Sequence, residues 1–217
     1  MMRTRIAKMK TFPVACVTFL ILVQTTRGQN QFPEAKKIMG LYNEESSWSP
    51  DGKSIAFDSS RPGKTAIFIW NIETREQKRL TSGDANDITP EWSSDGKQIA
   101  FVSDRTGRNE IYVINSNGGD PRQLTNDKSD NIHPHWSPDG ERIIYCSARD
   151  NTDQAHAPEG EVYEIYVMNA DGAGVKQITQ LHGRNTSPKW SPDGKKISFD
   201  HAAQGECDIF LVNAPQK

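Results

Sequence analysis

The sequence predicts an all-β protein in which one small antiparallel sheet unit occurs four times. Three observations support this: a short motif that begins with Trp recurs, alternating apolar segments follow each copy, and the copies are evenly spaced. The four Trp residues are separated by 44, 44 and 54 positions; they are Trp48, Trp92, Trp136 and Trp190. A sheet of this size cannot bury both of its faces alone, so the copies must stack around an axis. The predicted fold is therefore a β-propeller of four blades.

Each repeat is expected to contain four short strands. The first leads into the Trp, and the Ser-Pro-Asp-Gly segment that follows forms a β-turn, because Pro fixes φ at about −65° and Gly supplies a positive φ. The second strand carries alternating apolar residues such as Ile99 and Phe101. The third ends at an Asn, and the fourth ends in Leu-Thr or Ile-Thr. The predicted repeats are 48–91, 92–135, 136–189 and 190–213.

The last repeat differs from the others because no Leu-Thr strand follows Asn213. Residues 36–39, Lys-Lys-Ile-Met, resemble the fourth strands and precede Trp48 at a similar distance. We expect this segment to close the last blade, which would protect an open sheet edge. Two arrangements stay open: a closed four-bladed monomer, and an open ring that a second chain completes.

The motif Trp-Ser-Pro-Asp-Gly-Lys, the segments Ser103-Asp-Arg and Glu110-Ile-Tyr-Val, and the trailing Leu-Thr resemble the WD-like repeat of TolB-type β-propellers. Propeller domains of prolyl oligopeptidases and dipeptidyl peptidases contain the same repeat. The resemblance spans about residues 36–213 and implies a propeller in a cell-envelope setting. TolB has six blades and an α/β domain, so its own partners are not carried over. Peptidase activity is not expected, because the sequence contains no Gly-x-Ser-x-Gly nucleophile motif.

Residues 1–28 are expected to be a secretory signal peptide, which leaves residues 29–217 for the propeller. The segment contains five basic residues, no acidic residue and an apolar run from Phe12 to Val23. This run is shorter than the roughly 20 residues of a membrane-spanning helix, so no membrane span is expected after the signal is removed. We therefore predict export to the periplasm or the extracellular space.

Removal of the signal would leave an acidic chain. The 217 residues include 26 basic and 28 acidic side chains, and loss of five basic residues changes the net charge from −2 to −7. Binding to nucleic acid is not expected, because phosphate binding requires a clustered cationic surface. Cys146 and Cys207 would remain in a compartment where disulfides form, and both a bridge and two free thiols stay open.

The candidate binding residues lead into each Trp, because the innermost strands line the channel of a propeller. Five positions before Trp, every repeat has a polar side chain that we expect to make a local hydrogen bond, such as an Asx turn. The residue directly before Trp differs in every repeat, which favours a binding site and is also typical of unconstrained surface. The predicted binding residues at the channel mouth are Asn43, Asp87, Glu91, Asn131, His133, His135, Asn185 and Lys189.

The segment His133-Pro-His135 places two imidazoles on the same side of a strand. A metal site needs three or four convergent ligands. No such set can be assigned even when His156, His182 and His201 are included, so we predict no metal, no cofactor and no catalytic residue.

Two further features accompany the repeats. The third repeat contains ten extra residues, 150–159, which form either a partner-binding flap or a tolerated insertion. An Arg recurs after the second strand, at Arg61, Arg105 and Arg149, and we expect each to form a contact within its own blade.

The leading functional prediction is an exported, non-enzymatic scaffold, monomeric or homodimeric, that binds another protein or a glycan or peptide ligand. The alternative is a small carbohydrate-active enzyme, lyase-like or hydrolase-like, with a His/acid cluster at the channel mouth. Convergence of His133, His135 and Glu91 would favour the enzyme, and scattered side chains would favour the scaffold.

Overall fold

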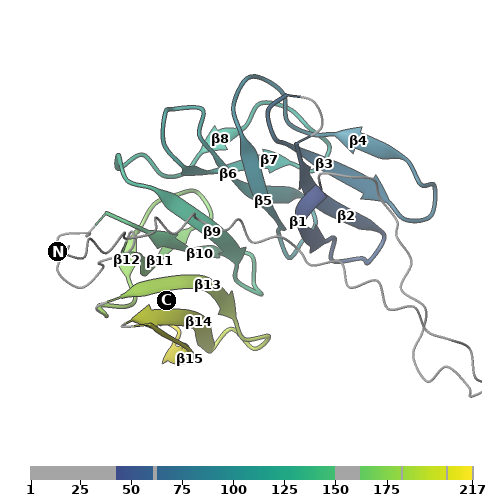
Figure 1. Ribbon diagram of the computed structural model, residues 1–217. Helices are drawn as coiled ribbons and strands as arrows, with labels where there is room; N and C mark the ends of the chain where they lie inside the picture. The colour runs from purple at the N-terminus through teal and green to yellow at the C-terminus, as the bar shows by residue number, and fades with distance from the viewer. Residues whose placement is uncertain (1–42, 61–62, 150–161, 182, 204, 217) are drawn as a thin grey trace, which may run out of the picture. The chain divides into compact units, whose positions relative to one another are not determined.

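The computed structural model describes residues 43–60, 63–149, 162–181, 183–203 and 205–216. The secondary structure of these residues consists of fifteen β-strands in four antiparallel sheets, one from each repeat (Figure 1). None of the described segments is a helix that could span a membrane. The predicted all-β repeat organisation is confirmed. The expected signal peptide, closing strand and insertion lie outside the described residues.

We call the four sheets blades 1 to 4. Blade 1 contains β1 (Asn43–Trp48), β2 (Ser54–Ser59), β3 (Ala66–Asn71) and β4 (Gln77–Arg79). Blade 2 contains β5 (Asp87–Trp92), β6 (Gln98–Ser103), β7 (Glu110–Asn115) and β8 (Arg122–Gln123). Blade 3 contains β9 (Asn131–Trp136), β10 (Arg142–Ser147), β11 (Glu164–Asn169) and β12 (Lys176–Gln177). Blade 4 contains β13 (Arg184–Trp190), β14 (Lys196–Ala203) and β15 (Glu206–Asn213), and in every blade the strands pair in chain order.

The turn between the first and second strands has the same construction in all four blades. In blade 1 the Ser49 hydroxyl donates to Asp51 Oδ1 at 2.6 Å and accepts from the Ser54 backbone N–H at 2.8 Å. Gly52 has a φ of 69°, a left-handed conformation that glycine adopts without steric cost. The equivalent glycines have φ values of 72°, 72° and 69°; they are Gly96, Gly140 and Gly194. The predicted β-turn is confirmed.

Apolar layers between neighbouring sheets hold the blades together. Between blades 2 and 3, Ile111 and Val113 of β7 pack in one cluster with Trp136, and all three are at most 5% exposed. Equivalent layers surround Trp92 between blades 1 and 2 and Trp190 between blades 3 and 4. The repeated Trp is therefore a packing residue of each junction, and the core is a series of thin layers.

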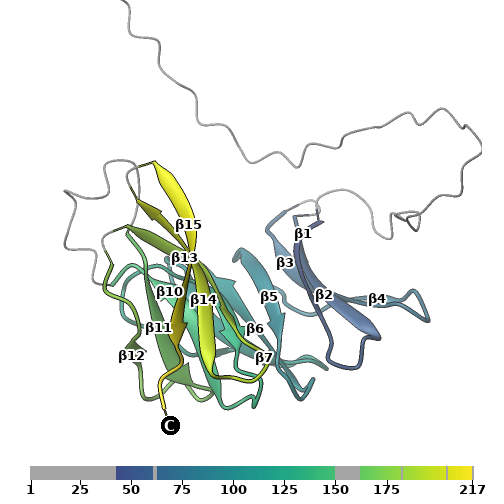
Figure 2. The ribbon, with the colours of Figure 1, turned by 90° about the horizontal axis from the view of Figure 1, so that it is seen from below.

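The innermost strands are β1, β5, β9 and β13, and in chain order each of the first three contacts the next one. Among the described residues, no strand of blade 1 contacts a strand of blade 4. Blade 4 has three strands where the others have four, as the sequence predicts, and β15 is its outer edge (Figure 2). Closure of this blade by residues 36–39 stays a prediction.

The recurring Arg residues lie within their own blades, as predicted for Arg105 and Arg149. Arg105 Nη2 lies 3.0 Å from Asp87 Oδ1, and its guanidinium lies 4.6 Å from the Tyr112 ring centroid. The Arg149 guanidinium lies 4.4 Å from the ring centroid of Tyr166. Each guanidinium therefore lies against the aromatic ring of the third strand of its own blade.

The two cysteines of the propeller are not bridged. Cys146 is buried, and burial raises the pKa of its thiol. Cys207 is exposed on β15. Of the two alternatives left open by the sequence, the structure has two free thiols.

One carboxyl group is buried in blade 1. Asp58 lies on the same side of β2 as Ala56, which packs in the layer between blades 1 and 2. It is 2% exposed, and its Oδ1 has no hydrogen-bond partner among the described residues. Burial raises the pKa of Asp58 to about 7, and the charges of Glu44 and Glu45 add to the shift. Ionisation of Asp58 therefore opposes folding.

We expect the substitution Asp58→Asn to stabilise the protein at pH 8 and to have little effect at pH 4. Because the folded-state pKa of Asp58 is raised above its ordinary value, 3.8, the unfolded chain releases this proton first. The free energy of unfolding therefore falls as pH rises from about 4 to about 7, and then levels off. Asn avoids this loss, and the expected gain at pH 8 is about 1 to 3 kcal/mol. Urea unfolding of both proteins at the two pH values measures it; an equal difference at both would contradict the assignment.

Candidate ligand-binding site

Each innermost strand contains a bulge that begins three residues before its Trp. In blade 2 the pairing with the second strand shifts between Ile88 and Glu91, and blades 3 and 4 show the corresponding shift. In blades 2, 3 and 4 the first residue of the bulge has a left-handed backbone, with φ of 51° at Thr89, 52° at His133 and 54° at Ser187. A Pro follows each of them, and Pro cannot donate to a strand ladder. The bulge is therefore part of the repeat.

These bulges hold side chains in a strained backbone. A positive φ is unfavourable for residues with a Cβ atom and most of all for the β-branched Thr89. Each such residue costs on the order of 1 to 3 kcal/mol, which neighbouring structure must offset. Three blades adopt the same conformation at the same position, so the packing of the blades imposes it.

The bulges of the four innermost strands converge on one pocket of about 150 Å³. All four blades contribute to its lining, through residues 45–46, 89–91, 133–134 and 187–189. Each blade supplies a different set of side chains, which include two acids, Glu45 and Glu91, an imidazole, His133, and an amine, Lys189. The pocket is consequently polar and carries both signs of charge.

Glu91 makes a close contact with the next blade. Its Oε1 lies 3.3 Å from His135 Nε2, and the two side chains are 22% and 20% exposed. Burial raises the pKa of Glu91, while Lys189 and a hydrogen bond with Ser47 oppose the shift. Burial lowers the pKa of His135 to about 4, and Lys189 adds to this effect. Burial also lowers the pKa of His133, so both imidazoles act near pH 7 as neutral hydrogen-bonding groups.

The residues five positions before Trp lie away from the pocket and make hydrogen bonds that hold the strands. Asp87, Asn131 and Asn185 are at most 2% exposed and do not line the pocket. Asp87 accepts from Arg105 at 3.0 Å, whereas Asn131 Nδ2 donates to Glu110 Oε2 of blade 2 at 2.9 Å. Asn185 Nδ2 donates to a main-chain oxygen of blade 3 at 2.8 Å. The last two bonds join neighbouring blades. Asn131 Nδ2 also makes the predicted kind of local hydrogen bond, to the Ser129 carbonyl and to Asp127 Oδ1, both at 3.0 Å. The side chain of the fourth predicted residue, Asn43, lies outside the described part of the structure.

The residues directly before Trp make different contacts in the four blades. Glu91 and Lys189 line the pocket. His135 contacts Glu91 but does not line the pocket itself. The Ser47 hydroxyl instead accepts from the backbone N–H of Trp92 at 3.1 Å, which joins blades 1 and 2. Of the predicted binding residues, the structure therefore brings together Glu91, His133, His135 and Lys189.

Sequence reasoning missed the bulge residues Glu45, Thr89 and Ser187. The available signal was Pro two positions before Trp in three of the four repeats. Pro within a strand indicates a bulge or an edge, and a bulge in an innermost strand turns its side chains toward the axis.

His133, His135 and His201, the histidines that the structure describes, do not form a metal centre with one another. Among the described residues, no group of three His, Cys, Asp or Glu side chains is placed to hold a metal ion. His133 Nδ1 lies 4.0 Å from Cys146 Sγ, and His201 Nδ1 lies 2.8 Å from Asn185 Oδ1. Of the three side chains on which the enzymatic alternative depends, Glu91 and His135 are therefore in contact, while His133 lies against a thiol.

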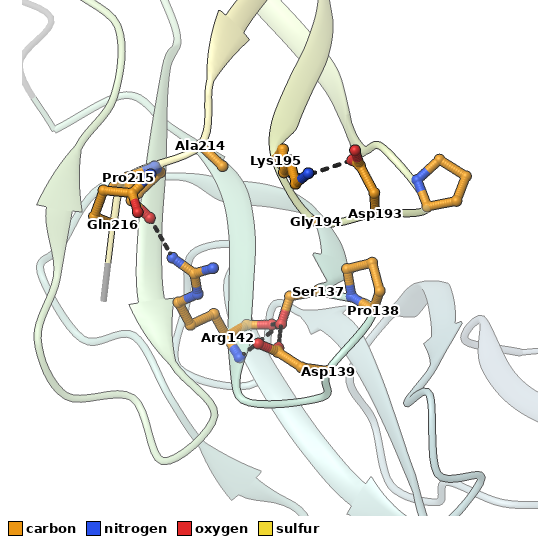
Figure 3. Close-up of a pocket in the computed structure, with 11 residues that line it drawn as sticks. Ser137, Pro138, Asp139, Arg142, Asp193, Gly194, Lys195, Ala214, Pro215 and Gln216 are labelled. Carbon is orange, nitrogen blue, oxygen red and sulfur yellow. Dashed lines mark hydrogen bonds between the residues drawn. The ribbon is translucent and has the colours of Figure 1, made fainter.

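A larger pocket of about 680 Å³ lies between the Ser-Pro-Asp-Gly turns of blades 3 and 4 and the C-terminal residues (Figure 3). Its polar groups maintain the local structure: Arg142 Nη1 donates to the Pro215 carbonyl at 2.7 Å, and Ser137 donates to Asp139 at 2.5 Å. Ser137 and Asp139 belong to the repeated turn, which has the same role in every blade, and Arg142 is the first residue of β10. The smaller pocket, where the repeats differ, is the better candidate for ligand binding.

Comparison with known proteins agrees with this architecture. The crystal structure of TolB from Acinetobacter baumannii is 28% identical, has a TM-score of 0.62 and covers 77% of this chain and 40% of its own. The structure of putative TolB from Agrobacterium tumefaciens is 27% identical, has a TM-score of 0.63 and covers 82% of this chain and 61% of its own. The TolB homolog of Chlorobium luteolum is 34% identical over 50 residues, which are 23% of this chain and 12% of that protein.

The chain thus spans between about an eighth and three fifths of the length of these relatives. The family model of the TolB beta propeller domain matches residues 21–158, which is more than half of the chain. On the repeats, the sheet topology and this match, the chain belongs to the TolB β-propeller domain family.

Proposed function

We propose that this protein is an exported, non-enzymatic scaffold whose pocket at the innermost strands binds a segment of another protein or a small glycan or peptide ligand. One observation carries the proposal. The pocket receives an ionisable side chain from every blade, namely Glu45, Glu91, His133 and Lys189, and these side chains stand one or three positions before Trp, where the four repeats differ.

The residues five positions before Trp differ from the pocket residues, because they are chemically similar in the repeats. Asp87, Asn131 and Asn185 are similar in chemistry, are buried, and take part in hydrogen bonds that hold the strands. A purely structural role would favour the same residue type in every blade at the pocket positions as well. A concave site with a few convergent polar groups and perturbed pKa values is instead typical of binding.

The size of the pocket limits what it can hold. Sites for whole small molecules usually enclose about 300 to 1,000 Å³, and this pocket encloses about 150 Å³. It therefore suits one polar side chain of a partner or one polar group of a glycan. The rest of the contact would come from the surface around the pocket, where Lys189 is exposed.

Export is the second part of the proposal. It is supported by the acid-free, basic and apolar composition of residues 1–28 and by the cell-envelope setting that the resemblance to TolB-type repeats implies.

We expect the double substitution Glu91→Gln and Lys189→Met to reduce retention of a bound partner by about tenfold or more. A loss of about 1.4 kcal/mol of binding energy has this effect, and both charges border the pocket. The measurement is affinity capture from the native secreted or periplasmic fraction, followed by titration with the captured protein or glycan. The matched control is Lys97→Met, because Lys97 is 80% exposed on a turn away from the pocket. Equal retention by all variants, or turnover of a glycan from a panel, would contradict the proposed function.

We expect expression in a bacterial host to yield a processed protein whose first residue is at or near Gln29. The substitution Leu20→Arg interrupts the apolar run and should leave an unprocessed precursor in the cytoplasm. N-terminal sequencing and fractionation measure both effects, with Lys97→Met as the processed control. An intact N-terminus in the wild-type protein would exclude cleavage.

A further inference from the structure

Large apolar side chains are exposed in the first and the last blade. In blade 1, Trp48 is 61% exposed. In blade 4, Ile209 and Leu211 on β15 are 80% and 60% exposed. Each of these residues has counterparts at the equivalent positions of other blades that are buried between two blades. These internal junctions therefore show what kind of surface packs against each exposed residue.

The blade 4 residues correspond to one side of an internal junction. Ile209 and Leu211 lie four and two positions before the Asn that ends their strand, as Ile111 and Val113 do in β7. In blade 2 these two positions are 0% and 2% exposed, because they pack in the same cluster as Trp136 of the next blade. The exposed surface of blade 4 therefore corresponds to the face that, at an internal junction, packs against the Trp of the next blade.

The blade 1 residue corresponds to the other side of the same junction. Trp48 ends β1 as Trp136 ends β9 and Trp190 ends β13. Trp136 and Trp190 are 5% and 7% exposed, since each packs against the preceding blade. On the same face of blade 1, Ile55 and Phe57 are 6% and 0% exposed, so Trp48 is the large apolar side chain that this face exposes. Trp48 and the Ile209–Leu211 surface thus correspond to the two sides of one junction.

We propose that the Ile209–Leu211 surface of one copy of this chain binds the Trp48 surface of a second copy, in a head-to-tail junction built like the three internal ones. Each copy has one surface of each kind. Two copies related by a two-fold axis therefore use both surfaces and close the assembly.

A charged contact supports the same pairing. At the junction of blades 3 and 4, the guanidinium of Arg142 lies 4.7 Å from the Trp190 ring centroid. Arg142 comes six residues after the Trp of its own blade, and Lys196 occupies the same position in blade 4. Lys196 is exposed, and in the proposed junction it lies over Trp48 of the second copy, where a cation stabilises the contact with the indole ring.

The polar residue on the blade 4 surface is compatible with burial. Asp200 lies one position further along the second strand than Phe199, as Asp58 does relative to Phe57 in blade 1. Asp58 is already buried in this chain. A carboxyl group at this position is therefore tolerated in a junction of this type.

The test is the molar mass of the purified full chain in solution, measured by light scattering over a concentration series. We expect a mass of at least two chains that falls toward one chain on dilution. Trp48→Glu or Ile209→Glu should each abolish self-association, with unchanged circular dichroism because both side chains are exposed. Val175→Glu is the matched control, since Val175 is 39% exposed and lies on neither surface; it should associate like the wild type.

Mixing the two monomeric variants distinguishes head-to-tail pairing from any symmetric contact. The Trp48→Glu variant keeps an intact blade 4 surface, and the Ile209→Glu variant keeps an intact blade 1 surface. The mixture should therefore form a complex of one copy of each, although neither associates alone. A monomeric wild type at high concentration overturns the proposal, as does self-association of Trp48→Glu alone or a failure of the mixture to associate.

Discussion

The packing of each sheet against the next one is the interaction on which the rest of this structure depends. A blade has apolar side chains on both faces, and its own residues can cover neither. Trp136, for example, is buried only because Ile111 and Val113 of the preceding blade lie in the same layer. Stability therefore comes from several thin layers between blades, and this explains how a chain with 35% apolar residues forms an ordered fold.

The same stacking places the innermost strands side by side and creates the candidate site. Polar residues secure the inner strands to the preceding blade, as Asn131 does through Glu110. The bulges of Thr89, His133 and Ser187 then turn side chains toward a shared pocket. The backbone strain of these residues is tolerated because both flanks of each strand are fixed by packing. The scaffold and the site thus use different residues of the same strand.

The repeated design also determines which side chains are exposed in the first and the last blade. An interior blade buries both faces, whereas blades 1 and 4 expose large apolar side chains whose counterparts are buried at the internal junctions, as Trp48 and Ile209 show. The two terminal surfaces are unlike each other, because each blade has a Trp side and an Ile/Val side. Contacts between copies can therefore be head-to-tail, with the surface of the last blade of one copy against the first blade of the next.

The sequence alone was sufficient for the blades, because their signals are local. The Trp motif, the Ser-Pro-Asp-Gly turn and the alternating strands each depend on residues close together in the chain, and they predicted the four sheets and the missing fourth strand of blade 4. The candidate site was only half predicted: Glu91, His133 and Lys189 reach the pocket, while Asp87 is buried within its blade. Only the tertiary structure decided which of these side chains reach the pocket, as it decided that Cys146 and Cys207 stay apart. The physical reason is that convergence of side chains at the axis depends on how the blades stack, and the stacking is not encoded in the spacing within one repeat.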